Sequence, residues 1–221
     1  MKDHSFSYEE LNRFSNSDPY NFVPTHLRSL LKELKHYEKT LNFPAVHNDV
    51  GQLLAFFLSG QRPERIFEMG SGYGHSAFWY FVGAQDSLKE VILTEKRSDL
   101  ERVFDNLCWP VNWKNRMNYI QGDAFEALQD VDGQFDLILV DGVKADYLKF
   151  IKLALPKLSS NGIIAIDNSY WRGSFLRESV RVKKKSAQNI FELHTWIRNQ
   201  KNLKAIFVPF LDGLTLIQKL K

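Results

Sequence analysis

Apolar residues follow two spacings that alternate along this chain. From residue 65 onward, short runs of apolar residues alternate with longer stretches in which apolar positions recur every three or four residues. The runs are typical of β-strands, and the longer stretches are typical of amphipathic helices. Because strands that alternate with helices build a parallel sheet covered on both faces, the pattern predicts an α/β fold.

The expected parallel strands are five apolar runs, at 65–69 (RIFEM), 91–95 (VILTE), 117–121 (MNYIQ), 135–141 (FDLILVD) and 162–167 (GIIAID). The run FDLILV shows no alternation of apolar and polar residues. Such a strand is buried on both faces, so we place it in the middle of the sheet. Helices are predicted from residue 124 and near residues 76–82, 99–107, 146–158 and 187–199.

Two further strand-like runs close the chain, at residues 204–210 (KAIFVPF) and 213–219 (GLTLIQK). Only Leu211 and Asp212 separate them. A parallel crossover needs a dozen or more residues, so these runs must form an antiparallel pair. The prediction is a mostly parallel sheet of seven strands that ends in an antiparallel hairpin, with helices on both faces.

Residues 1–60 are expected to form a helical lead-in that packs on the same domain. Helix-like stretches lie at residues 27–41 and 50–59, with Asn48 and Asp49 as candidate caps of the second. A chain of 221 residues, 44% of them hydrophobic, suits one well-filled core better than two. We therefore expect a single domain, with its main part at residues 61–221.

Bulk composition narrows the function classes. A net charge of +3 is small beside 29 basic and 26 acidic residues, so nucleic acid is not expected as a partner. Cys108 is the only cysteine, which excludes an internal disulfide and fits a reducing compartment. No apolar run approaches the roughly 20 residues needed to cross a bilayer, and the first residues lack an apolar signal segment. We expect a cytoplasmic protein without a membrane partner.

A glycine-rich loop, residues 68–76 (EMGSGYGHS), comes after the first strand and opens a helix. Glycines let the backbone approach a ligand closely, and the free N–H groups of a helix start favour polar or anionic atoms. Glu95 ends the next strand, where it is placed to accept hydrogen bonds from ribose hydroxyls. The alternative is a tight turn with a surface glutamate. The pattern favours a nucleotide-like ligand on Glu95 and on the loop glycines Gly70, Gly72 and Gly74.

Two details favour S-adenosylmethionine over a dinucleotide. The spacing G-x-G-x-G does not meet the G-x-G-x-x-G fingerprint of pyrophosphate binding. Glu68, just before the loop, suits a ligand that carries a sulfonium and an ammonium group. Asp123 and Ala124 come after the third strand, where Asp123 could meet an adenine edge, cap a helix, or do both. His75 could approach the donor, although a histidine at a helix start commonly serves the backbone.

Polar side chains also lie at the ends of the fourth and fifth strands. Asp141 ends one of these strands, Asp167 and Asn168 end the other, and Lys144 comes three residues after Asp141. Carboxyl ends of parallel strands form a ligand crevice, so the three oxygen donors could converge on a hard cation such as Mg²⁺, Ca²⁺ or Mn²⁺. The alternative is that the aspartates cap the helices or loops next to them and that the lysine is solvated.

Taken together, these motifs resemble the metal-dependent O-methyltransferases that include catechol O-methyltransferase and caffeoyl-CoA O-methyltransferase. The resemblance runs from about residue 43 to residue 219. Its most specific parts are the D-x-x-K spacing of Asp141 and Lys144, the DN pair, and the closing DGLTL. It implies the Rossmann-like class I methyltransferase fold and transfer of a methyl group from S-adenosylmethionine to a hydroxyl of a small, catechol- or phenol-like acceptor.

The resemblance also implies roles for single residues. Metal ligands would be Asp141, Asp167 and Asn168, with Lys144 as the catalytic base beside Asp141. Val143 occupies a place where the caffeoyl-CoA type has an acid and the catechol type a tryptophan. Contacts to the methyl donor would come from Val46, Glu68, Gly70, Ser76, Glu95 and Ala124, and the donor site as a whole would also include Gly72, Gly74, Asp123 and Asp141.

Two other functions compete with methyl transfer. A nicotinamide-dependent oxidoreductase shares the glycine loop and the ribose acid but leaves the DN pair and the hairpin unexplained. A non-catalytic RNA- or protein-binding module on the same fold would draw on the basic side chains at residues 172–185, which could equally be a solvated loop. The acceptor, the metal and the formation of a homodimer stay open.

Overall fold

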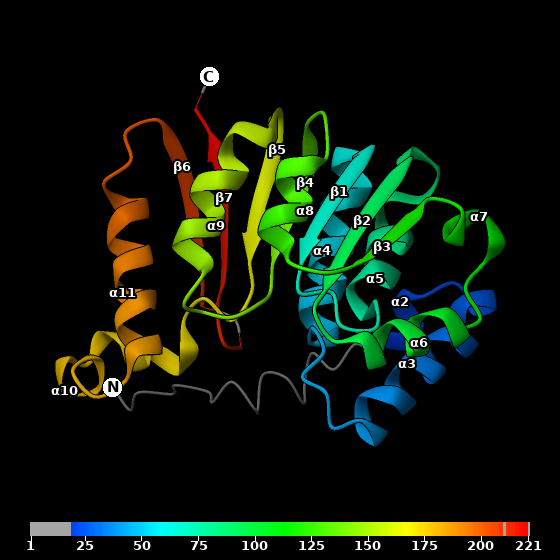
Figure 1. Ribbon diagram of the computed structural model, residues 1–221. Coiled ribbons are helices and arrows are strands. Elements are labelled where there is room, and N and C mark those ends of the chain that lie inside the picture. The colour runs from blue at the N-terminus through cyan, green and yellow to red at the C-terminus, as the bar shows by residue number, and fades with distance from the viewer. Residues whose placement is uncertain (1–18, 210, 221) are drawn as a thin grey trace, which may run out of the picture.

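The computed structural model describes residues 19–209 and 211–220 of the chain. One sheet runs through it in the order β3-β2-β1-β4-β5-β7-β6 (Figure 1). Strands β1 to β5 pair in parallel, and β7 is antiparallel to both β5 and β6. The predicted sheet with a closing hairpin is confirmed. Its strands are β1 (Arg65–Met69), β2 (Glu90–Glu95), β3 (Met117–Gln121), β4 (Phe135–Val140), β5 (Leu158–Ile166), β6 (Leu203–Val208) and β7 (Leu214–Lys219).

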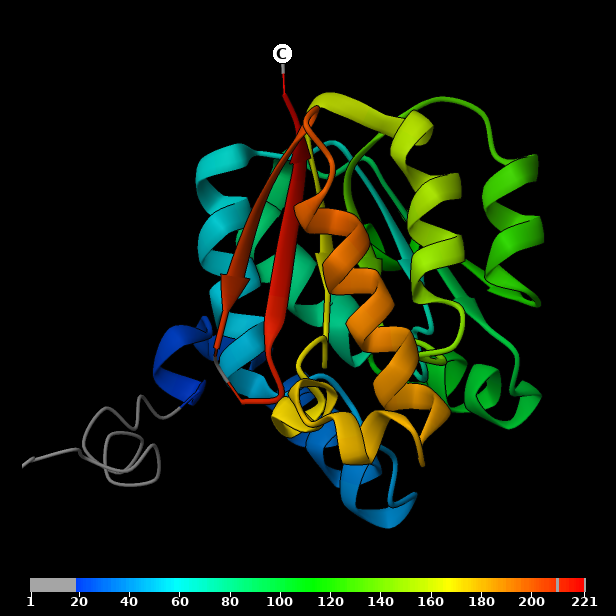
Figure 2. The ribbon, with the colours of Figure 1, turned by 90° about the vertical axis from the view of Figure 1, so that its left-hand side faces the viewer.

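Helices cover both faces of the sheet, as the edge-on view in Figure 2 shows. One apolar core lies under α3 (Arg28–Thr40), α4 (Asn48–Gln61), α5 (His75–Ala84), α6 (Ser98–Asn106) and α7 (Val111–Lys114). The other core lies under α8 (Ala124–Asp130), α9 (Tyr147–Ala154) and α11 (Lys185–Arg198). The shorter elements are α2 (Pro19–Phe22), η1 (Thr25–Leu27), η2 (Gln85–Ser87), η3 (Leu155–Lys157), η4 (Trp171–Leu176) and α10 (Glu178–Arg181).

Strand β4 lies in the middle of the sheet, as its unbroken apolar run predicts. Leu137 and Leu139 face the core under α4 and α5, and Ile138 and Val140 face the opposite core. All four side chains are 0–2% exposed. A strand buried on both faces fixes its neighbours firmly, so the loops after β1, β4 and β5 start from rigid positions.

Several predicted boundaries were wrong. The helix expected at residues 146–158 ends at Ala154, and Pro156 lies in the 3-10 turn η3 directly after it. Proline lacks an N–H and disfavours the helical conformation of the residue before it. Strand β5 begins at Leu158 and not at residue 162, because Leu158 already pairs with Phe135 of β4, before an irregularity in the register.

The cap of α4 also differs from the prediction. Asn48 and Asp49 lie inside the helix, and His47 is the N-cap, whose ring accepts a hydrogen bond from the Asp49 N–H. The lead-in residues 1–18 and Phe210 of the last hairpin lie outside the described residues. Within the described ranges, no helix has the length and apolar character to cross a bilayer.

Candidate active site

A cavity of about 420 Å³ opens at the carboxyl ends of strands β1 to β5. Its walls come from the loops after these strands and from residues 43–46, which connect α3 to α4. The carboxyl edge of a parallel sheet is where such folds bind ligands. Of the residues predicted for the site, the cavity is lined by Val46, Glu68, Gly70, Ser76, Glu95, Asp123, Ala124, Asp141, Lys144 and Asn168.

The glycine loop depends on close backbone packing. Gly70 has a φ of 86°, and a Cβ added there would lie 2.1 Å from the carbonyl oxygen of Asp141. Gly72 has a φ of 55°, and its Cβ would meet the ring of Phe43 at 2.5 Å. Only glycine tolerates both the left-handed backbone and the close approach. The loop is therefore pressed against the end of β4 on one side and against residue 43 on the other.

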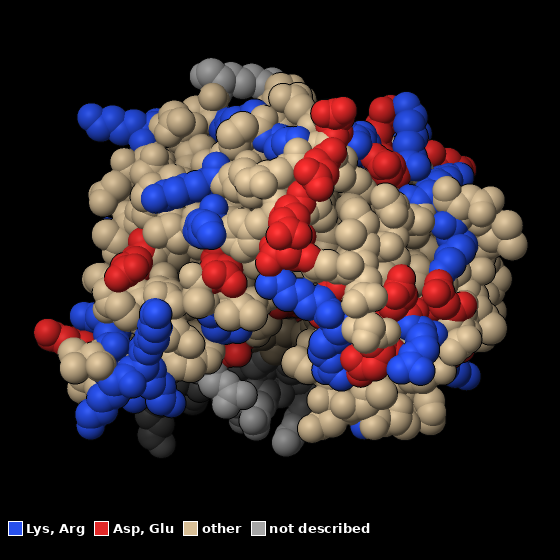
Figure 3. Space-filling model, in the orientation of Figure 1, with Lys and Arg blue, Asp and Glu red and all other residues tan. Residues whose placement is uncertain are grey.

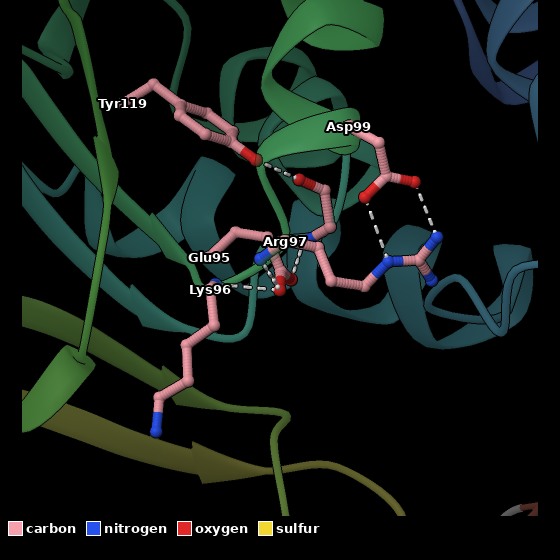
Figure 4. A network of polar contacts seen from close by, with 6 residues as sticks. Glu95, Lys96, Arg97, Asp99 and Tyr119 are labelled. Atoms are coloured by element: carbon pink, nitrogen blue, oxygen red, sulfur yellow. Dashed lines mark hydrogen bonds and ion pairs between the residues drawn. The ribbon is translucent and has the colours of Figure 1, made fainter.

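Glu95 ties the end of β2 to this loop. One carboxylate oxygen, Oε2, accepts a hydrogen bond from the Gly72 N–H at 3.0 Å. Oε1 accepts from the N–H groups of Lys96 and Arg97 at 2.8 and 3.1 Å. Tyr119 on β3 donates to the Gly72 carbonyl at 2.6 Å, so strands β2 and β3 hold the loop together (Figure 4). A carboxylate offers about four acceptor sites, which leaves one for a ligand hydroxyl.

Glu68 is a buried carboxylate, only 1% exposed, on β1 just before the loop. Its oxygens accept hydrogen bonds from the Ser76 hydroxyl at 2.5 and 2.7 Å. Within the described ranges, no Lys, Arg or His side chain forms an ion pair with it. Burial raises the pKa of Glu68 to about 8. A positively charged ligand group in the cavity would restore the ionised form.

Asp123 and Lys96 both line the cavity and form an ion pair with each other. The Asp123 side chain accepts from the Phe125 N–H at 2.7 Å and so caps α8. Its second oxygen lies 2.7 Å from Lys96 Nζ, and the hydrogen bond from that lysine holds the pKa of Asp123 below its usual value. The capping role is therefore present, and the same residue also lines the cavity.

Asp141, Asp167 and Lys144 lie close enough to influence one another electrostatically. Burial, followed by the Asp167 and Glu68 carboxylates, raises the pKa of Asp141 well above its usual value. Burial also raises the pKa of Asp167, while the Lys144 charge opposes the shift in both. Two carboxylates that repel each other in a buried place are stabilised by a shared cation.

Asn168 completes this group of oxygen donors. Its backbone has a φ of 52°, a left-handed conformation that asparagine tolerates better than most residues. The loop of the last hairpin holds the next residue, because the Ser169 N–H and hydroxyl both donate to the Gly213 carbonyl, and Thr215 donates to the Ser169 hydroxyl at 2.8 Å. The closing DGLTL segment therefore supports the DN pair.

The donor set fits a hard cation. It offers the carboxylates of Asp141 and Asp167 and the amide oxygen of Asn168, which are ligands that Mg²⁺ or Ca²⁺ accepts. Among the described residues, no group of three or more His, Cys, Asp or Glu side chains is arranged to hold a metal ion.

Some of the predicted residues lie away from the cavity wall. Gly74 faces the rings of Phe104 and Trp109. Asp167 is 5% exposed, and its carboxylate accepts a hydrogen bond from the Asn168 N–H at 2.8 Å. Both lie outside the set of residues that line the cavity. Gly72, which binds Glu95 through its N–H, is likewise not among the residues that line the cavity.

The basic segment at residues 172–185 is also separate from the cavity wall. Arg177, Lys183, Lys184 and Lys185 are exposed on and around α10, where basic side chains gather at the lower left of Figure 3. The side chain of Arg172 lies outside the described part of the structure. Arg181 donates to the Phe175 carbonyl at 2.8 Å.

The structure adds residues around the cavity that the sequence did not single out. Phe43 packs on Gly72, Lys96 forms an ion pair with Asp123, and the Tyr119 hydroxyl donates a hydrogen bond to the glycine loop. Lys96 directly follows Glu95, the acid predicted to bind the ribose, so its position in the sequence could have pointed to it. Phe43 lies 29 residues before Gly72 in sequence, and no local pattern reports such a contact.

Comparison with known proteins identifies the fold and the family. The SAH-bound methyltransferase PaMTH1 of Podospora anserina has the same fold, with a TM-score of 0.79 and 24% identity over 98% of both chains. O-methyltransferase ankF of Aspergillus thermomutatus is 25% identical over 76% of this chain and 75% of its own. A caffeoyl-CoA O-methyltransferase of Stellaria longipes is 23% identical over 88% and 83%.

The fold is that of the class I methyltransferases. A family profile described as O-methyltransferase matches residues 23–220. This chain therefore belongs to the O-methyltransferase family.

Proposed function

We propose that the protein transfers the methyl group of S-adenosylmethionine to a hydroxyl of a small, catechol- or phenol-like acceptor, with help from a divalent cation. The observation that carries the proposal is that two carboxylates, those of Glu68 and Glu95, line one cavity. Glu68 is buried without a cationic partner among the described residues, and Glu95 lies on the rim beside the glycine loop. A ligand with a positive methionine end and a ribose matches both.

The donor would lie along the carboxyl edge of the sheet. Glu95 would accept a hydrogen bond from a ribose hydroxyl, and Asp123 with Ala124 would face the adenine. Glu68 and Ser76 would hold the methionine ammonium group, since opposite charges in a buried place attract strongly. This arrangement fixes the donor methyl group relative to the strand ends of β4 and β5, and fixed alignment lowers the barrier to group transfer.

Asp141, Asp167 and Asn168 would hold Mg²⁺ or a similar cation. When bound, such an ion polarises an acceptor oxygen and lowers the pKa of its hydroxyl. Lys144 lines the same cavity and, as the neutral amine, would take the hydroxyl proton on Nζ. The carboxylates and the lysine thus act on the acceptor, and the glycine loop acts on the donor.

The acceptor side of the cavity is open and apolar at one point. Val143 lines the cavity and is 65% exposed. A short branched side chain at this position fills less of the cavity than a larger one would. This openness supports a flat phenolic ring as acceptor, held between the apolar wall and the carboxylates.

A methylation screen tests the proposal. The protein is incubated with S-adenosylmethionine, Mg²⁺ and a panel of catechols, flavonoids, acyl-CoA phenols and other hydroxylated metabolites, and products are identified by mass. The proposal predicts a singly methylated product with at least one phenolic acceptor and none with excess chelator. Methylated products that persist in excess chelator would place the enzyme among metal-independent methyltransferases.

A further inference from the structure

His75 is the first residue of α5 and lines the cavity, although only 3% of its surface is exposed. Neither Nδ1 nor Nε2 of its ring has a hydrogen-bond partner among the described residues. The expectation that this histidine serves the backbone at the helix start is therefore wrong. A buried polar group without a partner destabilises the fold, and such groups call for an explanation in a binding or catalytic role.

The surroundings of His75 are basic. Burial is the main reason why its pKa falls to about 4, and Lys35 on α3 and His47 at the start of α4 lower it further. The Tyr73 ring packs edge-on against the imidazole at 6.4 Å between centroids. The ring is thus neutral near pH 7, with one N–H to donate and one nitrogen to accept. Basic neighbours and the N-terminus of a ten-residue helix together favour an anion here.

The proposed donor presents an anion at this end of the cavity. Its ammonium group and its α-carboxylate are attached to the same carbon atom. With the ammonium beside Glu68 and Ser76, the α-carboxylate is repelled by Glu68 and directed to the other side. His75, which lines the cavity at the start of α5, offers a ring N–H that has no partner among the described residues.

We infer that the ring N–H of His75 donates a hydrogen bond to the α-carboxylate of S-adenosylmethionine and so acts as a positioning residue for the donor. This inference rests on the proposed function. It gives the buried imidazole a partner that arrives only with the ligand. Without the donor, the ring N–H of His75 is buried without a hydrogen-bond partner among the described residues, which destabilises the protein. Donor binding supplies that partner.

A paired ligand experiment tests the inference. Wild-type protein and His75→Phe, which keeps a ring but has no polar atoms, are titrated calorimetrically with S-adenosylhomocysteine and with its analogue in which hydrogen replaces the α-carboxylate. The variant should bind S-adenosylhomocysteine about tenfold to hundredfold more weakly, the usual effect of one charge-assisted hydrogen bond. Its affinity for the decarboxylated analogue should equal that of the wild type.

Trp79→Phe is the matched control. Trp79 lies one turn further along α5, and its Nε1 is likewise buried without a partner in the described part of the chain, but it packs against Gly51 and is not a cavity residue. Its removal should leave both affinities unchanged. In wild-type protein, the ring ¹⁵N resonances of His75 should shift with S-adenosylhomocysteine and not with the analogue, a measurement that does not depend on any variant folding.

Other outcomes would overturn the inference. An equal loss of affinity for both ligands in His75→Phe would show a role in packing, and no loss for S-adenosylhomocysteine would show no role. If the wild type binds neither ligand, the proposed function itself fails. The wild-type titrations alone show this, so that failure is distinct from a failure of the inference about His75. The variant should unfold at the same temperature as the wild type or higher, because it removes unpaired buried atoms.

Discussion

The carboxylate of Glu95 accepts a hydrogen bond from the backbone N–H of Gly72 at 3.0 Å and so joins the end of β2 to the glycine loop. The acid that faces the ribose in our proposal is also the one that shapes the loop. Donor binding and loop geometry therefore depend on the same side chain, and a substitution there affects both.

Glu95→Ala should weaken S-adenosylmethionine and S-adenosylhomocysteine alike. The change removes the ribose acceptor and also leaves the N–H groups of Gly72, Lys96 and Arg97 without their partner. Loss of charge-assisted hydrogen bonds corresponds to about tenfold to hundredfold in affinity. Calorimetry measures this directly. Glu90→Gln, at the opposite end of β2, should bind both ligands as the wild type does, and equal affinities for the wild type and Glu95→Ala would remove Glu95 from the site.

The affinity for S-adenosylmethionine should rise with pH and level off near pH 8. In the empty site burial holds the pKa of Glu68 at about 8, so the side chain is mostly protonated at neutral pH. The donor ammonium favours the ionised form, so binding below pH 8 must release this proton. Titrations in buffers of different ionisation enthalpy count the protons released. Glu68→Gln should bind more weakly and release none, whereas a flat wild-type profile would contradict the assignment.

The same shift affects the stability of the unliganded protein. Because the folded protein holds the Glu68 proton more tightly than the unfolded chain does, ionisation costs stability as pH rises from 4.5 to about 8. Relative to Glu68→Gln, the wild type should therefore lose stability across this window. Thermal unfolding of both proteins over the pH range measures the difference, and parallel curves would show that Glu68 ionises without cost.

Asp141→Asn and Asp167→Asn should each reduce binding of Mn²⁺, used as a spectroscopic probe of the cation site, and abolish methyl transfer. Removing one of two carboxylates takes away a charged ligand that a hard cation needs. Affinity for S-adenosylhomocysteine should change little, since the donor is held mainly by Glu68 and Glu95. Electron paramagnetic resonance measures how much Mn²⁺ is bound. The control is Asp132→Asn, a change at an exposed aspartate, which should bind Mn²⁺ as the wild type does. Mn²⁺ binding that survives in both variants would exclude these residues as ligands.

Lys144→Met should lower turnover by roughly 10² to 10⁴, the usual effect of losing a general base, with little change in donor or metal affinity. The loss should shrink for acceptors that are already acidic, because their hydroxyl needs less help to lose its proton. Steady-state rates on a series of phenols of graded acidity give this dependence. Lys152→Met, on the solvent side of α9, is the control, and near-normal turnover of Lys144→Met on a weakly acidic phenol would make the lysine structural.

Much of this architecture could be predicted because the relevant signals are local. Unbroken apolar runs such as FDLILV mark buried strands, and the last residue of each strand falls at the ligand edge of a parallel sheet. Glu95, Asp141 and Asn168 could therefore be located from the strands alone. Strand β5 shows the limit, because Ser159, Ser160 and Asn161 interrupt its apolar run, while Leu158 before them already pairs with Phe135 of β4.

The rest depends on packing between segments distant in sequence. His75 is buried without a hydrogen-bond partner among the described residues, near Lys35 of α3 and His47 at the start of α4, which no spacing along the chain reveals. The contact of Phe43 with Gly72 and the ion pair of Lys96 with Asp123 likewise join separate loops. Helices of four residues, such as α7 and α10, are too short to show a 3.6-residue period.

The most direct test of the account is a calorimetric titration of the wild-type protein with S-adenosylhomocysteine, NADH and single-stranded RNA in parallel. The cavity that joins buried Glu68 to Glu95 predicts one S-adenosylhomocysteine site per chain and no binding of the other two ligands. The same site should bind S-adenosylhomocysteine more weakly in Glu68→Gln and in Glu95→Ala. Saturable binding of NADH or RNA without binding of S-adenosylhomocysteine would contradict the account and favour an oxidoreductase or a nucleic-acid-binding module on the same fold.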